Sequence, residues 1–170
     1  PSHVPDAVLA IEDRRFREHF GIDLSSLVRA FAANIRAGRT VQGGSTITQQ
    51  LAKNLFLKPD RDLARKLEEV LIALWLEIRL SKNEILELYL NRVYFGPGEH
   101  GTENAAERYF GKSAQYVNVS EAAVLAGLLK APSKFSPLGS PGLARSRARV
   151  VLKKMHEAGI LNEGQWRAAA

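Results

Sequence analysis

Apolar side chains recur at helical spacing through most of this sequence, and that periodicity limits the fold more than any other feature. The pattern is strongest from Leu63 to Leu80, where apolar residues lie three or four positions apart. Between Val70 and Leu76 the segment is apolar all round, which predicts a helix running through the middle of the domain. No stretch of four or more residues alternates cleanly enough to predict a strand. We therefore predict an all-α fold without internal repeats.

Capping residues indicate where the individual helices begin and end. Asp6 is expected to cap a helix that runs to Ile11, and Asp23 to cap a helix at Leu24–Ala37 that ends at Gly38. Ser45 is expected to cap a helix that runs to about Phe56, before Pro59. The capping box Ser81–Glu84 predicts a helix from Lys82 to about Arg92. Weaker signals predict helices at Glu103–Phe110, Glu121–Lys130 and Leu143–Ala158, and another after Asn162. A glycine-rich turn is expected at Gly96–Gly101.

Composition fits one globular domain over residues 1–170, with 45% apolar and 25% charged residues. The net charge of +6 favours an anionic partner such as nucleic acid, phosphate or lipid headgroups. There is no cysteine, which excludes disulfides and thiolate-metal sites. No apolar run approaches the roughly 20 residues that cross a bilayer. The ends of the sequence read as a piece cut from a longer, membrane-anchored protein.

Several familiar motifs fail on their context. Gly96–Gly101 matches the dinucleotide fingerprint, but a helix is expected before it, where that fingerprint needs a strand. The four histidines are too scattered for a metal cluster, and the S-x-x-K arrangement of penicillin-reactive serines is missing. The basic helix Leu143–Ala158 carries Arg145, Arg147 and Arg149 and leaves open a nucleic-acid-binding module, although a solvated basic face is the preferred interpretation.

Two adjacent carboxylates stand beside two guanidiniums near the start of the chain. Glu12 and Asp13 are followed by Arg14 and Arg15, with Phe16 and then His19 close behind. Such a mixture can keep one acid ionised so that it acts as a base. A solvated charged turn is the alternative interpretation.

The segment from Leu24 to Pro59 contains no acidic residue but several cations among large apolar side chains. A surface that is cationic and apolar at once suits contact with anionic lipid headgroups. Within it, Gly43 and Gly44 precede Ser45 and a predicted helix, whose first turn would present a positive dipole end to a phosphate. A plain junction between loop and helix is the alternative.

A third candidate is the charged run that precedes the most apolar part of the predicted Leu63–Leu80 helix. Glu69 is expected to be partly buried there, and Arg65, four residues earlier, is its expected partner. The pairing is compatible with a purely structural role.

Taken together, these clusters resemble the ordered motifs of the peptidoglycan glycosyltransferases, glycosyltransferase family 51, found in class A penicillin-binding proteins and monofunctional transglycosylases. The likeness spans about Val8 to Pro137. The segments that carry it are Glu12–Phe16 with His19, Gly43–Gln50 with Lys53, Arg65-Lys66 with Glu69, Lys82–Asn91, and Ala105–Lys112 with Leu125–Leu128.

The resemblance implies a lysozyme-like helical domain with a small membrane-facing lobe. It also implies that lipid II is polymerised into β-1,4-linked glycan strands, with inversion and release of undecaprenyl pyrophosphate. The enzyme would work at the periplasmic face of the bacterial cytoplasmic membrane, on lipid II and the nascent lipid-linked glycan. The resemblance is compatible with a C-terminal transpeptidase domain in the same protein, and it implies no nucleic acid.

The resemblance also implies roles for individual residues. Glu12 would be the catalytic base, Asp13 would support it, and Glu69 would be the second catalytic acid. A divalent cation, Mg²⁺ or Mn²⁺, at Glu69 through the pyrophosphate is left open. The remaining residues expected to bind substrate are His19, Ser45, Thr46, Gln50, Lys53, Arg65 and Lys66.

Three other functions remain open at the level of sequence. A lysozyme-like hydrolase would share the fold but would not need the cationic, apolar Leu24–Pro59 segment. A basic helical module that binds nucleic acid would leave Glu12 and Glu69 unexplained. A catalytically inactive scaffold is disfavoured by the intact motifs.

Overall fold

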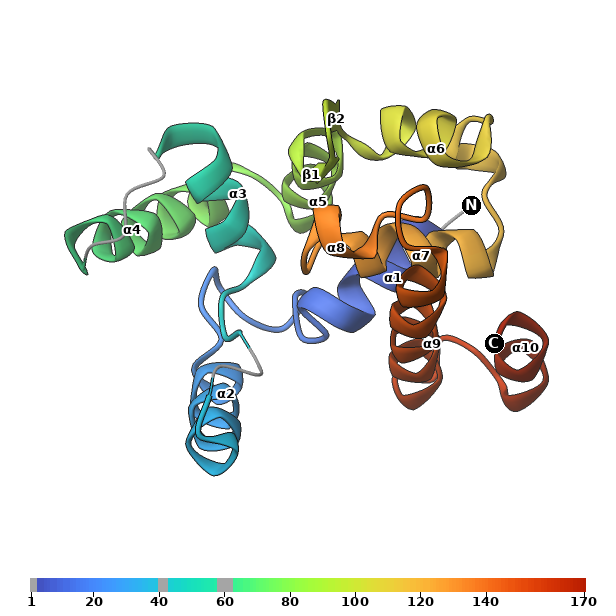
Figure 1. The fold of residues 1–170 in the computed structure, drawn as a ribbon. Helices are drawn as coiled ribbons and strands as arrows, with labels where there is room; N and C mark the ends of the chain where they lie inside the picture. Colours follow the sequence, from blue (N-terminus) through green and yellow to red (C-terminus); the bar gives the residue numbers. More distant parts are fainter. Residues whose placement is uncertain (1–2, 40–42, 58–62) are drawn as a thin grey trace. The chain divides into compact units, whose positions relative to one another are not determined.

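The computed structural model describes residues 3–39, 43–57 and 63–170, which fold into two compact units (Figure 1). Unit 1 is formed by Pro1–Arg14 together with Leu90–Ala170, and unit 2 is formed by Arg15–Tyr89. Apart from two short strands, the regular elements of the described residues are helices, so the predicted all-α fold is confirmed.

The elements of unit 1 are mostly helices that follow one another closely. They are α1 (His3–Glu12), β1 (Tyr94–Gly96), β2 (Glu99–His100), α6 (Thr102–Phe110), the 3₁₀ turn η1 (Ala114–Tyr116), α7 (Val119–Leu128), α8 (Pro132–Phe135), α9 (Pro141–Glu157) and α10 (Glu163–Ala169). The elements of unit 2 are α2 (Leu24–Ala37), α3 (Ile47–Phe56), α4 (Leu63–Arg79) and most of α5 (Lys82–Arg92).

The core of unit 1 lies where α1, α7 and α9 pack against one another (Figure 1). Each helix contributes large apolar side chains that are almost fully buried, among them Val8, Leu125, Leu128, Leu152 and Met155. Burial of a side chain of this size contributes roughly 1.5–3 kcal/mol to folding. The three helices therefore hold the C-terminal end of α1, and Glu12 with it, in a well-packed setting.

The predicted glycine-rich turn forms a small antiparallel hairpin between β1 and β2, with Tyr94 opposite His100 and Gly96 opposite Glu99. Gly101, which follows β2, has a φ of +84°, and a Cβ on it would lie 2.8 Å from the carbonyl oxygen of Asn91. Only glycine fits this close approach without strain. A hairpin preceded by helix α5 also excludes the dinucleotide-binding interpretation.

Unit 2 is built on α3 packed against α4. Ile47, Leu51 and Leu76 form its apolar interior. Gly21 supports the loop that leads into α2, because its φ of +75° and its closeness to the backbone of Ala73, where a Cβ would lie 3.3 Å from the carbonyl oxygen, both disfavour a side chain.

Several predicted helix ends are confirmed. Asp23 caps α2 through the backbone N–H of Ser26, and Gly38 ends that helix with a φ of 61°. The capping box also forms: the Ser81 N–H donates to Glu84 Oε2 at 2.8 Å, and the Glu84 N–H donates to Ser81 Oγ at 3.3 Å. These signals succeed because each depends on neighbours within four residues.

Two predicted caps are wrong. Thr46, not Ser45, caps α3, because Gln49 lies three residues after Thr46 and completes a capping box with it. Asp6 lies inside the first turn of α1, which begins at His3. A carboxylate in a first turn still stabilises the helix through the dipole.

The prediction that the Leu63–Leu80 helix runs through the middle of the domain is also wrong. One face of α4 is buried, with Ala73 and Leu76, but another carries large exposed apolar side chains. These are Leu67, Leu71, Trp75 and Ile78, with exposed fractions of 61%, 57%, 49% and 71%. Unit 2 is small and packs α3 against α4, so only part of the helix is covered.

The expected stop at Pro59 and the cation Lys58 lie outside the described residues. Among the residues that are described, no helix combines the length and the apolarity needed to span a bilayer.

Candidate active site

A buried carboxylate with two cations lies near the start of α4. Glu69 is 3% exposed, and its Oε2 accepts a hydrogen bond from Arg65 Nη1 at 3.2 Å. Its other oxygen, Oε1, contacts the ammonium of Lys66, which also donates to Ser45 Oγ at 3.0 Å. We call these four residues the Glu69 cluster. The predicted pairing of Arg65 with Glu69 is confirmed.

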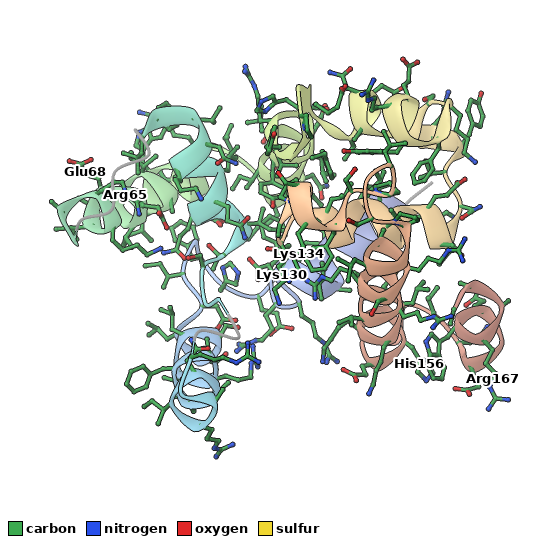
Figure 2. All side chains as sticks on the ribbon, in the orientation of Figure 1. Arg65, Glu68, Lys130, Lys134, His156 and Arg167 are labelled. Carbon is green, nitrogen blue, oxygen red and sulfur yellow. The ribbon has the colours of Figure 1, made fainter. Side chains whose placement is uncertain are left out.

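The spacing on α4 explains why the Glu69 cluster forms. Lys66 and Arg65 precede Glu69 by three and four residues, so all three side chains share one face of the helix. Arg65 is labelled in Figure 2, as is Glu68, a neighbour of Glu69 on α4. Two positive charges meet one negative charge, and the cluster keeps a net positive charge beside the start of α3. This excess suits an anion.

The N-terminus of α3 is fixed by buried polar contacts. Thr46 is 2% exposed, and its hydroxyl donates to the carbonyl oxygen of Gly21 at 2.6 Å while it accepts from the Gln49 N–H at 3.2 Å. Because the dipole of α3 is positive at this end, Ser45 and Lys66 lie where an anion is favoured.

A second buried carboxylate, that of Glu77, binds two residues of the motifs, Thr48 and Lys82. Glu77 accepts hydrogen bonds at Oε1 from the Thr48 hydroxyl at 2.6 Å and from Lys82 at 2.7 Å. The Lys82 ammonium also lies 4.5 Å from the centroid of the Phe16 ring. Phe16, Thr48 and Lys82 therefore join segments that are distant in sequence. Sequence reasoning missed Glu77, because no local spacing connects it to Thr48.

Asp23 is ionised at neutral pH and holds α2 to the loop before it. Burial alone would raise the pKa of Asp23, but hydrogen bonds from Ser26 and Ser25 and the charge of Arg15 outweigh it. The net effect holds the pKa of this carboxyl well below its usual range.

Besides Thr46, three predicted substrate-binding residues lie in unit 2 outside the Glu69 cluster. Gln50 accepts a hydrogen bond at Oε1 from the Tyr89 hydroxyl at 2.9 Å, which gives it a fixed orientation on α3. Lys53, one turn further along the same helix, is exposed. The half-buried ring of His19 meets Phe16 edge-on at 6.2 Å between centroids.

Glu12 and Asp13 lie in unit 1. Glu12 is the last residue of α1 and is half-buried, and Asp13 follows it with 6% exposure. The two arginines that come next engage other partners: Arg14 Nη2 donates to the carbonyl oxygen of Glu157 at 3.0 Å, and Arg15 pairs with Glu18 and Asp23. In these contacts the partners of Arg14 and Arg15 are thus residues other than Glu12 and Asp13.

Some of the predicted site residues are in direct contact with one another in the described part of the structure. Ser45, Arg65, Lys66 and Glu69 touch one another directly in unit 2. The other residues predicted in that unit are His19, Thr46, Gln50 and Lys53, while Glu12 and Asp13 belong to unit 1.

The side chains around Glu69 are poorly suited to bind a metal ion. Both carboxylate oxygens of Glu69 already face cations, Arg65 and Lys66, which repel a divalent ion. Among the residues that the structure describes, no group of three or more His, Cys, Asp or Glu side chains could hold a metal. A protein-built cation site at Glu69 therefore does not fit these residues.

Comparison with known proteins places this chain in a family. A model of the Transglycosylase family matches residues 1–156. Penicillin-binding protein 1A of Aquifex aeolicus is 52% identical over 99% of this chain, and penicillin-binding protein 1A of Escherichia coli is 46% identical over 98%. A shorter relative from Cupriavidus necator is 45% identical over 99% of this chain, which covers 73% of it.

A solved structure gives the same result. The crystal structure of penicillin-binding protein 1A from Haemophilus influenzae matches 72% of this chain with a TM-score of 0.51 and 33% identity, over 15% of that protein. The chain belongs to the transglycosylase family, and it is a peptidoglycan glycosyltransferase domain like those of class A penicillin-binding proteins. It spans 23% of the Aquifex aeolicus protein and 20% of the Escherichia coli protein.

Proposed function

We propose that this domain polymerises lipid II into β-1,4-linked glycan strands, inverting the anomeric configuration and releasing undecaprenyl pyrophosphate. The observation that carries the proposal is the Glu69 cluster, a net positive group of buried and half-buried side chains at the start of α3. A pyrophosphate leaving group needs positive charge that is in place before the reaction begins.

The leaving group would be bound by the cations of unit 2. Lys66 and Arg65 are held in fixed positions by Glu69, so they lose little conformational freedom when an anion arrives. Ser45, Thr46 and Gln50 lie at or near the positive end of α3, and Lys53 extends the cationic surface by one helical turn. In this account Glu69 orients the two cations, and no step uses a metal ion.

Glu12 would act as the general base. The 4-hydroxyl of the acceptor attacks the anomeric carbon of the donor, the bond from that carbon to the pyrophosphate oxygen breaks, and the hydroxyl proton moves to the carboxylate of Glu12. One displacement turns an α-linked pyrophosphate into a β-1,4 bond. General base catalysis of this kind contributes about 10²–10⁴-fold. Asp13 would support Glu12, and His19 would contact substrate.

Unit 2 also carries surfaces suited to a lipid bilayer. On α2, large apolar side chains at helical spacing are exposed by 64–72%: Leu24, Val28, Phe31 and Ile35. Arg29 and Arg36 on the same helix are exposed as well. Apolar contact together with cations favours an anionic membrane surface, here the periplasmic face of the cytoplasmic membrane. Unit 2 would then be the membrane-facing lobe of a lysozyme-like fold.

The proposal is tested by incubating the protein with labelled lipid II and, separately, with finished peptidoglycan. We expect long glycan strands and free undecaprenyl pyrophosphate from the first and no soluble fragments from the second. Fragments released from peptidoglycan without strands from lipid II would identify a hydrolase instead. A tight, strongly salt-dependent affinity for DNA without either reaction would favour the nucleic-acid module.

A chelator added to the lipid II reaction tests whether Mg²⁺ or Mn²⁺ takes part. Because the cations of the Glu69 cluster already supply positive charge, we expect polymerisation to continue with at most a modest loss. Complete loss, restored by Mg²⁺ or Mn²⁺ alone, would show that the pyrophosphate needs a divalent ion.

A further inference from the structure

One arginine of the basic helix α9 turns inward. Arg145 and Arg149 are exposed, as expected of a solvated basic face, but Arg147 is only partly exposed. Its Nε atom is buried and has no hydrogen-bond partner among the described residues. A half-buried guanidinium of this kind is costly unless a nearby charge compensates it. The prediction of a wholly solvated basic face is therefore wrong at Arg147.

The surroundings of Arg147 fix its side chain against α7 and α8. A Cβ on Gly127 of α7 would lie 3.0 Å from Arg147 Cγ, so the glycine provides the space for the arginine stem. At the other end, the guanidinium carbon lies 6.0 Å from the centroid of the Phe135 ring of α8, within the range of a cation–π interaction. The position of the guanidinium is thus built by two neighbouring helices.

The charge that acts on this guanidinium comes from Glu12. Burial lowers the pKa of Arg147, and the negative charge of Glu12 opposes that lowering. Helices α1 and α9, which carry Glu12 and Arg147, pack against each other in unit 1.

Glu12 occupies a position where an ionised carboxylate is disfavoured by its own helix. It is the last residue of α1, at the negative end of the helix dipole, and the last turn of α1 contains no basic residue. Arg14, the first cation that follows, donates to the carbonyl oxygen of Glu157. A compensating cation from another helix therefore has a clear physical function here.

We propose that Arg147 is a positioning residue that keeps Glu12 ionised and oriented for proton transfer. This inference rests on the proposed role of Glu12 as the general base, which must be a carboxylate before it can accept the hydroxyl proton. An opposite charge nearby favours that form and offsets the helix dipole. Arg147 itself makes no contact with the reacting atoms in this account.

The test compares Arg147→Gln with Arg145→Gln, which removes an exposed charge from the same helix. In lipid II polymerisation, Arg147→Gln should move the acid limb of the pH–rate profile to higher pH by about one unit, which lowers the rate on that limb about tenfold and the rate near neutral pH much less. Arg147→Lys should restore part of both, and Arg145→Gln should change neither. A purely structural role would lower Tm without moving the acid limb, and that result would overturn the inference.

A second readout does not depend on activity. The carboxyl of Glu12 can be followed by ¹³C NMR, assigned by its loss in Glu12→Gln, while pH is varied. Its titration midpoint should rise in Arg147→Gln and, to a smaller extent, in Gly127→Ala, where the added methyl displaces the arginine stem. Unchanged midpoints would refute the inference even if lipid II is polymerised. If lipid II is not polymerised, the proposed function fails, and the midpoints still decide whether Arg147 controls Glu12.

Discussion

The two units of this domain are stabilised in different ways. In unit 1, helices α1, α7 and α9 bury a continuous set of aliphatic side chains. In unit 2, three polar side chains at the start of α3, Thr46, Thr48 and Gln49, are buried together with the carboxylates of Glu69 and Glu77. Most of the large apolar side chains on α2 and several on α4 are instead exposed. Unit 1 therefore has a mainly apolar core, whereas the interior of unit 2 combines apolar side chains with buried polar and charged ones.

The difference extends to the two acids proposed to act in catalysis. Glu69 is buried and sits between two cations on its own helix, so its carboxylate is already paired. Glu12 is half-buried at the unfavourable end of α1, and its compensating charge comes from α9. A buried acid that is paired at both oxygens is suited to hold other groups in place, and a half-buried acid at a helix end is accessible for exchange of a proton.

The largest expected effect concerns Glu12. Glu12→Gln should reduce lipid II polymerisation by at least about 10²-fold, because the amide cannot accept the hydroxyl proton. Tm should hardly change, since the side chain is half-buried at a helix end. Asp6→Asn, at the other end of α1, is the control and should retain activity. Near-normal glycan synthesis by Glu12→Gln would remove Glu12 from the role of base.

Removal of a cation from unit 2 should have the next largest effect. Lys66→Ala leaves Glu69 with Arg65 alone and takes a donor from Ser45, so affinity for the lipid pyrophosphate donor should fall about tenfold or more. Lys53→Ala should also weaken donor binding, with little change in Tm because Lys53 is exposed.

The control for both lysine variants is Lys153→Ala on α9, which removes an exposed ammonium from unit 1. Donor affinity, measured by competition with labelled lipid II, should be unchanged in this variant. Equal losses in all three variants would mean that overall charge matters and that the Glu69 cluster has no special function.

The buried network around Glu77 should affect stability more than activity. Thr48→Val removes the hydroxyl that donates to Glu77 at 2.6 Å and keeps the shape of the side chain. Because Glu77 Oε1 then keeps only the hydrogen bond from Lys82 and loses a buried donor, the free energy of unfolding should fall by about 1–3 kcal/mol. Urea denaturation measures this change, with Ser133→Ala on the surface of α8 as control. An unchanged midpoint would mean that unit 2 does not depend on this contact.

The smallest effect is a pH dependence from Asp23. Its pKa is lower in the folded protein than the usual value of about 3.9, so it stabilises the fold above about pH 4, and this contribution is lost as pH falls. Asp23→Asn keeps a capping side chain but removes the charge. The variant should therefore be less stable by about 1 kcal/mol at pH 6, and the difference should shrink towards pH 3. A difference that is constant with pH would contradict the account.

Local signals predicted most helix boundaries of this fold. The cap at Asp23 and the Ser81–Glu84 capping box both depend on residues close in sequence, so they could be predicted from the sequence alone. Ser45 and Thr46 are adjacent hydroxyls that can each cap a helix, and the position of Gln49 decided between them. That signal was present in the sequence.

Tertiary features were harder to predict. The apolar run of α4 gave no indication of which face would remain uncovered, because hydrophobicity alone does not identify the partner. Arg147 was treated as one of several surface cations. It lies three residues after Ala144 and four before Val151, both buried, and this helical spacing could have placed it on the inner face of α9. Its closeness to Glu12 depends on the packing of separate helices.

The most direct test of the account is a crystal structure of the protein with a non-reactive lipid II analogue bound in the donor site. We predict that the pyrophosphate oxygens accept hydrogen bonds from Lys66 and Arg65. The anomeric carbon should face Glu12, with room between them for one acceptor hydroxyl. An analogue whose pyrophosphate contacts neither cation, or whose anomeric carbon lies far from Glu12, would contradict the mechanism.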